Sequence, residues 1–450
     1  MAADLKLAVS HADAGEFTAA WTLIDEALRS NPNDVRALVL ASYCCEKQGK
    51  LGLSYNLAKR AIDLKPNEPA AWTNAGRACD LLWRMEEAEH AYRQALKHID
   101  TPRAKALNLV NISAVFLQLG QYERAKVYAE KALEVEPQNR KARHNLGLCQ
   151  LAVRDWEHGW LNYHASIGSG QRYRWSYADE PEWQGESGGT VVVYGEQGIG
   201  DEICAASMYP DAIGRAGKVI MDCDKRLASL FRRSFPAAKV YGTRAQKEGL
   251  DWALEDQKID YSLASMQLGG LFRLKDEDFP TKPYLVPDAD KVLMWRALFS
   301  SKGKPAIGIA WTGGTEETAA RYRSVTLEQL LPIFKAVDAH WVSLQYKDSP
   351  EIVAFRAAHP EIDLRQYPAT TMKDYDETAG LVGAMDCVVS VPTSVVHLSV
   401  ALGVKTIAMK SATSCWKFAG EKFIEPAQLI PNAGDWAHTI SEAAKRLRNA

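Results

Sequence analysis

Small and apolar residues recur with a regular period along the first third of this chain. Alanine returns at spacings of 34, 34 and 37 residues, at Ala27, Ala61, Ala95 and Ala132. Each interval also contains a small residue that stands three positions after a larger apolar or aromatic one. A period of this length predicts pairs of helices, each of which buries its apolar face only by stacking on the neighbouring pairs.

The pattern resembles the tetratricopeptide repeat, a pair of antiparallel helices that stacks into a superhelix. Four units agree in register over residues 1–139, and a fifth, weaker unit runs from RKARHNLGLCQ to DWEHGWLNYHA. We therefore expect an α-solenoid of tetratricopeptide repeats over residues 1–166.

Arrays of this kind bind extended peptides in a concave groove lined by the first helix of each unit. Asn74, Asn111 and Asn145 occupy the same position of that helix, where the first two units have Lys6 and Leu40. Because a side-chain amide both donates and accepts hydrogen bonds, a row of amides could pair with a peptide backbone. We interpret these three residues as a short peptide-binding ladder. The alternative is that asparagine is simply common at this repeat position.

A linker is expected between the repeats and the rest of the chain. Residues 167–189 show no helical period and are rich in glycine, serine and aromatic residues. A flexible tether would carry few aromatic side chains, so this linker should pack across a domain face.

From Thr190 onward, short apolar runs alternate with helical segments. The runs are VVVYG, KVIMDC, AKVYG, AIGIAW, HWVSLQY, DCVVSV and KTIAMK. This alternation predicts parallel sheets covered by helices. Strand-and-glycine starts at Val191 and Ala306 predict two Rossmann-like halves, over residues 190–300 and 301–450. Because open parallel sheets bind ligands beyond the carboxyl ends of their strands, the loops after VVVYG, AIGIAW, VSLQY and VVSV are expected to form the site.

The first of these loops, GEQGIGDE, is a glycine-rich turn with an acid at the start of a helix. Its residues Gly195, Glu196, Gln197, Gly198 and Gly200 do not match G-x-G-x-x-G, and no Gly-Lys pair follows, so a dinucleotide fingerprint and a P-loop are both excluded. Backbone amides at a helix start can bind an anion, but an acid beside a phosphate costs Coulomb energy. Asp201 is better suited to proton abstraction or to capping the helix.

Four segments together resemble a bacterial family that fuses tetratricopeptide repeats to a glycosyltransferase domain related to the heptosyltransferases (glycosyltransferase family 9-like). These segments are PEWQGE, EQGIGDE, RYRSVTLEQL and SVPTSVVHLSVALG, and the resemblance covers essentially the whole chain. It implies the GT-B fold, with the acceptor bound by the first half and a nucleotide-sugar by the second. It also implies that Asp201 is the general base.

The same resemblance implies that Thr393, Ser394 and His397 form the turn that meets the donor diphosphate. Pro392 replaces the acid that the family usually has there. A core histidine is the alternative for His397. Asp376 resembles a family position near the donor loop, but it could instead cap a helix beginning at Glu377.

Two further loops offer donor-binding residues on chemical grounds. Gly313 and Gly314 permit close backbone approach, and the guanidinium of Arg323 can bind phosphate in a bidentate way or form a surface ion pair. Gln345 and Lys347 could contact ribose, base or phosphate.

Composition narrows the possible functions. The chain has 54 basic and 56 acidic residues, so a general nucleic-acid or membrane-surface binder is not expected. Eight scattered cysteines without a CxxC pair suggest reduced thiols in a cytoplasmic protein. Neither a signal peptide nor an apolar run long enough to span a bilayer is apparent. We expect no metal and no cofactor, since the D-x-D spacing at Asp222 recurs elsewhere in the chain.

These features lead to an expectation of a glycosyltransferase that moves a sugar from a nucleotide-sugar to a polypeptide held by the repeats. The reaction would invert the sugar without a metal, and family analogy makes a bacterial surface or flagellar protein the expected acceptor. Two alternatives remain: an interaction scaffold with an inactive GT-B domain, which Pro392 would explain, and a glycan-directed transferase whose repeats serve assembly.

Overall fold

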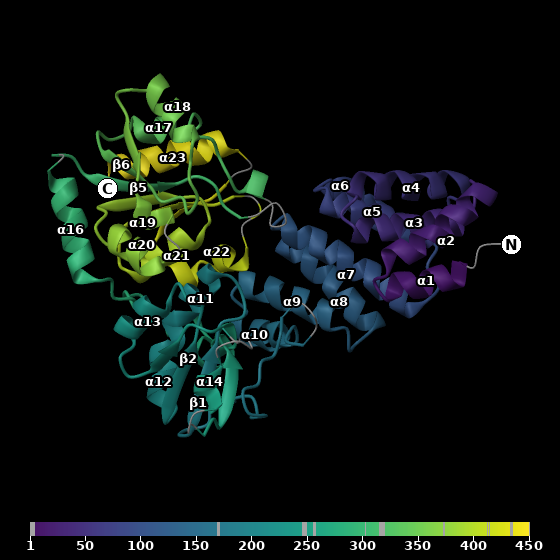
Figure 1. Ribbon diagram of the computed structural model, residues 1–450, viewed down its shortest axis with the longest axis horizontal. Helices are drawn as coiled ribbons and strands as arrows, with labels where there is room; N and C mark the ends of the chain where they lie inside the picture. Colours follow the sequence, from purple (N-terminus) through teal and green to yellow (C-terminus); the bar gives the residue numbers. More distant parts are fainter. Residues whose placement is uncertain are drawn as a thin grey trace. The chain divides into compact units, whose positions relative to one another are not determined.

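The computed structural model describes residues 5–168, 172–244, 250–254, 258–301, 303–314, 320–371, 374–411, 413, 415–432 and 435–449. It divides into two compact units, Met1–Cys149 and Gln150–Ala450. The first unit is helical and the second contains two β-sheets (Figure 1).

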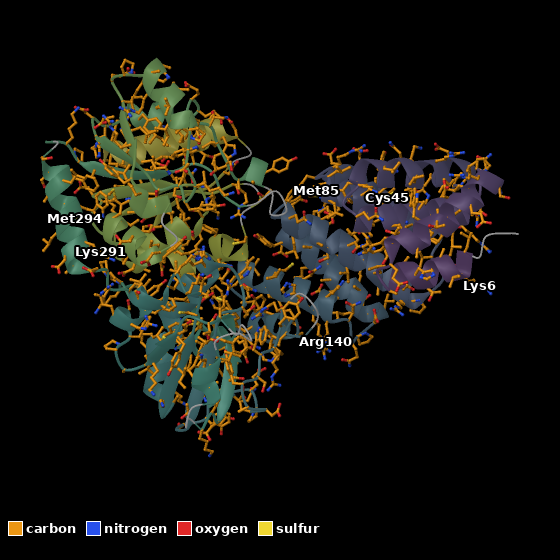
Figure 2. The ribbon with its side chains drawn as sticks, in the orientation of Figure 1. Lys6, Cys45, Met85, Arg140, Lys291 and Met294 are labelled. Atoms are coloured by element: carbon orange, nitrogen blue, oxygen red, sulfur yellow. The ribbon has the colours of Figure 1, made fainter. Side chains whose placement is uncertain are left out.

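The first unit consists of stacked helix pairs. Its helices are α1 (Leu5–Asp13), α2 (Phe17–Ser30), α3 (Val35–Lys47), α4 (Leu51–Leu64), α5 (Pro69–Leu81), α6 (Met85–Leu96), α7 (Pro102–Gln118) and α8 (Tyr122–Val135). The small residues Ala20, Ser54, Ala88 and Ala125 are fully buried where paired helices touch, as their period predicted. Figure 2 shows Lys6 on α1, Cys45 on α3 and Met85 on α6.

The fifth helix pair lies at the division between the units. It consists of α9 (Arg140–Ala152) and α10 (Trp156–His164), and α10 belongs to the second unit. The Trp160 ring lies so close to Gly269 that a Cβ there would be 2.2 Å from the ring, and Trp160 Nε1 donates to Arg273 O at 2.9 Å. Helix α10 is therefore packed into the α/β fold.

The second unit contains two sheets of parallel strands. The first has the order β3-β2-β1-β4, from β1 (Thr190–Tyr194), β2 (Lys218–Asp222), β3 (Lys239–Tyr241) and β4 (Tyr261–Ala264). The second has the order β10-β9-β8-β5-β6-β7, from β5 (Ala306–Ala310), β6 (His340–Ser343), β7 (Asp363–Gln366), β8 (Cys387–Ser390), β9 (Thr406–Met409) and β10 (Gln428–Ile430). The predicted parallel α/β architecture is confirmed. Three strands, β4, β7 and β10, were not indicated by the apolar runs.

Helices connect the strands of both sheets, and a last helix, α23, follows β10. They are α11 (Ile199–Ala205), α12 (Tyr209–Arg215), α13 (Ala228–Ser234), α14 (Asp251–Leu254), α15 (Gly269–Phe272), α16 (Ala289–Ser300), α17 (Leu331–Phe334), α18 (Glu351–Ala358), α19 (Pro368–Thr371), α20 (Tyr375–Val382), α21 (Ser394–Ala401), α22 (Trp416–Gly420) and α23 (Trp436–Arg448). The strand order reverses its direction of growth at β1 in one sheet and at β5 in the other. Ligands of open α/β sheets bind beside such reversals.

None of the described helices has both the length and the apolar character needed to cross a bilayer.

The segment between α10 and β1 packs onto the first sheet. Trp183 is 1% exposed, and its backbone N–H donates to Ser262 O in β4 at 3.1 Å. The Tyr177 hydroxyl donates to an Asp222 carboxylate oxygen at 2.8 Å, at the end of β2. These aromatic residues pack as predicted, whereas Tyr173 is 62% exposed.

Candidate functional site

A cavity of about 470 Å³ lies within the second unit, where loops from both sheets meet. Its lining comes from the four loops that follow β1, β5, β6 and β8, with additions from α20 and α22. Ligand pockets usually have volumes of about 300–1,000 Å³, so the space suits a small organic ligand. The predicted site residues that line it are Gly198, Gly200, Asp201, Gly313, Gly314, Arg323, Gln345, Thr393, Ser394 and His397.

Helix α21 begins at the cavity and is capped by Thr393. The Thr393 hydroxyl accepts a hydrogen bond from Val395 N at 3.2 Å, as expected for a threonine at this position. The next residue, Ser394, shares a hydrogen bond of 2.6 Å with the Tyr375 hydroxyl. The first amides and the dipole of a helix favour an anion at its start. The start of α21 is thus chemically suited to a negatively charged ligand group.

The first half of the unit contacts α21 through a glycine. A Cβ on Gly200 in α11 would lie 3.3 Å from both Cα and Cβ of Ser394, which is tighter than ordinary contact. Figure 1 shows α11, α21 and α22 gathered between the two sheets. The absence of a side chain at Gly200 therefore allows α11 to bring Asp201 close to the start of α21.

Asp201 forms an ion pair with a residue that the sequence did not single out, Lys417 of α22. Lys417 Nζ lies 2.5 Å from Asp201 Oδ1, and Asp201 Oδ2 accepts from Gly198 N at 3.0 Å. Lys417 is 8% exposed, whereas the Asp201 side chain is 23% exposed. Burial alone would raise the pKa of Asp201, but the charge and hydrogen bond of Lys417 outweigh it and hold that pKa below its usual value. Asp201 is therefore an ionised carboxylate that both caps α11 and pairs with a buried cation.

His397 lies one turn into α21 and is 4% exposed. Burial lowers its pKa to about 4, and the nearby Lys417 charge acts in the same direction, so the imidazole is neutral at physiological pH. Its Nδ1 atom is buried and has no hydrogen-bond partner among the described residues. A buried nitrogen without a partner that lines a cavity is a candidate ligand contact. The alternative of a purely structural core histidine would leave that nitrogen unsatisfied.

The loops after β5 and β8 hold each other in place. Arg323 Nη2 donates to Pro392 O at 2.8 Å, and Gly313 N donates to Ser324 Oγ at 3.1 Å. A Cβ on Gly313 would lie 3.0 Å from Pro392 O, so close backbone approach requires the glycine. Arg323 therefore contacts a loop carbonyl at the cavity, and its phosphate-binding role stays a prediction.

Gln345 and Lys347 have different surroundings. Gln345 is 5% exposed and donates from Nε2 to Thr312 Oγ1 at 2.7 Å, at the cavity. Lys347 is exposed and its ammonium lies 5.3 Å from the centre of the Tyr346 ring. The structure does not place Lys347 among the cavity-lining residues.

Three residues of the glycine-rich turn, Gly195, Glu196 and Gln197, are not among the residues that line the cavity. Glu196 accepts two hydrogen bonds from Arg172, at 2.6 and 3.1 Å, and both side chains are nearly fully buried. Gln197 Nε2 donates to the Tyr163 hydroxyl of α10 at 2.8 Å. A Cβ on Gly195 would lie 2.3 Å from the Glu202 carboxylate. These residues therefore fix the shape of the turn.

Asp376 is also not among the residues that line the cavity. Its carboxylate accepts from Arg233 Nη1 at 2.6 Å and from Lys291 Nζ at 2.8 Å, and Lys291 is labelled on α16 in Figure 2. The expected helix cap at this residue is wrong, because α20 begins at Tyr375 and its cap is Asp374, which accepts from Asp376 N at 2.9 Å. Asp376 ties three helices together.

The asparagines of the first unit make contacts between repeats. Asn74 Nδ2 donates to Val39 O at 2.9 Å, and Asn145 Nδ2 donates to Val110 O at 3.2 Å. Both side chains are more than nine-tenths buried. Asn111 Nδ2 has no hydrogen-bond partner among the described residues. Two of the three amides therefore connect successive repeats, and a peptide-binding role stays a prediction.

The D-x-D acids have structural partners. Asp222 accepts from Thr243 Oγ1 at 2.5 Å and from Tyr177, while Asp224 accepts two hydrogen bonds from Arg226, each 2.8 Å long. Across the described part of the chain, no group of three or more His, Cys, Asp or Glu side chains is placed to hold a metal ion.

Comparison with known proteins places the repeats in a family. The tetratricopeptide repeat family matches residues 5–69 and 107–139. The whole chain is similar to protein FlbA of Caulobacter vibrioides, with 25% identity over 507 residues, 98% of this chain and 83% of FlbA. A solved structure of pilF of Pseudomonas aeruginosa is 18% identical with a TM-score of 0.34, covering 36% of this chain and 72% of that chain. A thermophilic TPR protein of Thermus thermophilus is 22% identical with a TM-score of 0.33, covering 37% of this chain and 90% of that chain. The N-terminal region is thus a tetratricopeptide-repeat solenoid, followed by a parallel α/β region.

Proposed function

We propose that this protein is a glycosyltransferase that moves a sugar from a nucleotide-sugar to a polypeptide recruited by its repeats. The observation that carries this proposal is the cavity at the carboxyl ends of two parallel sheets, where Asp201, Lys417 and the start of α21 converge. A carboxylate from one half and a cation with a helix start from the other provide the two opposite functions that glycosyl transfer requires. The resemblance of the sequence to heptosyltransferase-related proteins supports the same function.

The donor diphosphate is assigned to the start of α21. Thr393, Ser394 and the guanidinium of Arg323 line that end of the cavity, and Lys417 adds a positive charge. Helix amides and fixed cations stabilise the developing charge of a leaving diphosphate without a metal. The nucleoside would lie toward Gln345, at the end of β6.

Asp201 is assigned as the general base. It would accept the proton of the acceptor hydroxyl while the acceptor oxygen attacks the anomeric carbon from the side opposite the diphosphate, which inverts the configuration. A positioned base of this kind typically contributes about 10²- to 10⁴-fold in rate.

The polypeptide acceptor is assigned to the repeat unit. A groove of about 790 Å³ in that unit is lined by residues of α1, α3 and α5, among them Val39, Leu40, Tyr43 and Asn74. Apolar, aromatic and amide side chains in one groove suit an extended polypeptide, and protein binding is the usual role of these repeats.

A thermal-shift panel with ADP, UDP, GDP and CMP, alone and as sugar conjugates, tests the donor assignment. A ligand present at 100 times its Kd stabilises the native state by about 2.7 kcal/mol. We expect one nucleotide to raise the melting temperature of the second unit, and a Thr393→Val variant to lose the shift. Because Thr393 caps α21, the variant without ligand should be about 1 kcal/mol less stable than the wild type. Its ligand-induced shift is therefore measured from the melting temperature of the ligand-free variant. No shift with any nucleotide would contradict the proposal.

The interaction scaffold is the second candidate, and the Asp201 ion pair favours it. Both carboxylate oxygens are occupied, one by Gly198 and one by Lys417. A carboxylate held in this way is a poor base. Donor-dependent sugar transfer to a polypeptide distinguishes the two functions, since a scaffold would show none.

A further inference from the structure

The ion pair between Asp201 and Lys417 joins the two halves of the second unit inside the cavity. Lys417 reaches from α22 to Oδ1 of Asp201 at 2.5 Å, while Oδ2 accepts the Gly198 amide hydrogen. The two residues line the same cavity as the start of α21. A cation and an anion that neutralise each other in a cavity must separate if the carboxylate is to act as a base and the ammonium is to bind an anionic ligand.

The other titratable groups facing the pair are His397 of α21, Cys204 of α11, Cys415 beside α22 and Tyr163 of α10. Burial holds His397 neutral, and it raises the pKa values of the Cys204 thiol and of Tyr163 above their usual values. None of these three groups therefore supplies a charge that could replace either partner.

The start of α21 offers a second group that can contact a negatively charged ligand, in addition to Lys417. The His397 Nδ1 atom is buried without a hydrogen-bond partner among the described residues, and it belongs to the first turn of the helix whose start faces the cavity. Lys417 has three donors on a flexible stem, so it can turn from one oxygen acceptor to another. Its helix is held by Trp416, whose ring lies 5.6 Å from that of Trp160 and 6.0 Å from that of Tyr163.

We propose that Lys417 is a positioning residue that holds Asp201 until the donor binds and then exchanges it for the diphosphate. The proposal rests on the glycosyltransferase function. The exchange leaves the partly buried Asp201 carboxylate with the Gly198 amide as its partner, and a carboxylate that loses its cation gains proton affinity. Asp201 then takes the proton of the acceptor hydroxyl, the acceptor oxygen bonds to the anomeric carbon, and the bond to the diphosphate breaks with its electron pair on the leaving oxygen. The base is thus available only after the donor is bound.

This exchange predicts that removing the catalytic carboxylate strengthens donor-product binding. In Asp201→Asn, Lys417 no longer has a competing anion, so the nucleoside diphosphate selected by the melting panel should bind about tenfold more tightly, which corresponds to about 1.4 kcal/mol. Lys417→Met should bind it about tenfold more weakly. In the double variant, the gain from Asp201→Asn should disappear, because the cation that produced it is absent.

Isothermal titration calorimetry of the full chain measures these affinities, with circular dichroism to show that each variant is folded. Lys417→Arg keeps the charge if Lys417→Met fails to fold, and it should retain most of the affinity. Lys335→Met, at an exposed lysine of the same half, is the matched control and should bind as the wild type does. Unchanged or weaker binding by Asp201→Asn overturns the exchange, and so does a gain that persists without Lys417, which would reflect simple repulsion. Binding of CMP but of no nucleoside diphosphate overturns the exchange alone, whereas absence of binding to every nucleotide of the panel, in wild type and Asp201→Asn alike, refutes the glycosyltransferase itself.

Discussion

The Arg172–Glu196 pair should be one of the most sensitive sites of the second unit. The side chains of the pair are 2% and 1% exposed, and their two hydrogen bonds measure 2.6 and 3.1 Å. Arg172 also donates to Ser166 Oγ at 3.2 Å and lies 4.3 Å from the centre of the Tyr163 ring. In Arg172→Met, the Glu196 carboxylate would remain buried without its cation. Breaking a buried pair from one side costs about 3–5 kcal/mol, so we expect a loss of that size in the free energy of unfolding.

Urea unfolding followed by tryptophan fluorescence measures this loss. Ten of the 13 tryptophans follow residue 150, so the fluorescence reports mainly on the second unit. The matched control is Lys304→Met, which removes an exposed partner of Asp338 and should cost less than about 1 kcal/mol. A double variant, Arg172→Met with Glu196→Leu, should recover much of the stability because no charge is left buried. If Arg172→Met alone lowers the free energy of unfolding by less than about 1 kcal/mol, the reasoning is refuted, because the Glu196 carboxylate would then be hydrated instead of buried without a partner.

Further predictions concern both units. Gly76→Ala would place a Cβ 2.6 Å from the Tyr92 ring, so it should destabilise the repeats by about 1–3 kcal/mol in circular-dichroism melts. In contrast, a Cβ on Gly52 would have nothing within 4 Å, so Gly52→Ala should stabilise α4 by about 0.5–1 kcal/mol. Asn145→Ala removes a buried bond to Val110 O and should cost about 1–3 kcal/mol in the same melts; no effect would favour a free, peptide-facing amide. Burial raises the pKa of Glu202 to about 8 despite Arg244 at 3.0 Å, so the folded state holds a proton that the unfolded state releases from about pH 4.5 upward. The free energy of unfolding should therefore fall between about pH 4.5 and 8 and level off above, and Glu202→Gln should lack this component in urea titrations across that range.

The repeat period and the apolar runs were sufficient to predict most of the fold. The repeats could be recognised in the sequence because each unit buries small residues at the same positions. The strands could be recognised because a strand buried on both faces has a continuous run of apolar residues. Strand β7, Asp363–Gln366, was missed because it is an edge strand with one polar face, so its sequence DLRQ has no such run. Strands β4 and β10, with the sequences YSLA and QLI, show no continuous apolar run either.

The candidate site was predictable where a loop follows a strand and not where a contact depends on tertiary approach. Asp201, Thr393 and Ser394 stand at strand ends that the alternating pattern revealed. Lys417 does not follow a predicted strand, because its segment WKFAG forms a short helix. Its partner Asp201 lies in the other half of the unit, so the sequence around Lys417 gives no sign of the ion pair. Asp376 was misread as a cap because two acids, Asp374 and Asp376, stand within one turn of the same helix start.

Helix α10 has a consequence for evolution by exchange of modules. It has the sequence position of the last repeat helix, yet Trp160 and Tyr163 fill a space bounded by Trp416, and Gln197 at the glycine-rich turn bonds to the same tyrosine. A recombination that replaced the whole repeat array, α10 included, would remove Trp160 and Tyr163 and with them their packing against Trp416. A viable crossover must therefore fall before α10, so any lineage that acquires a new recognition array inherits the old final helix.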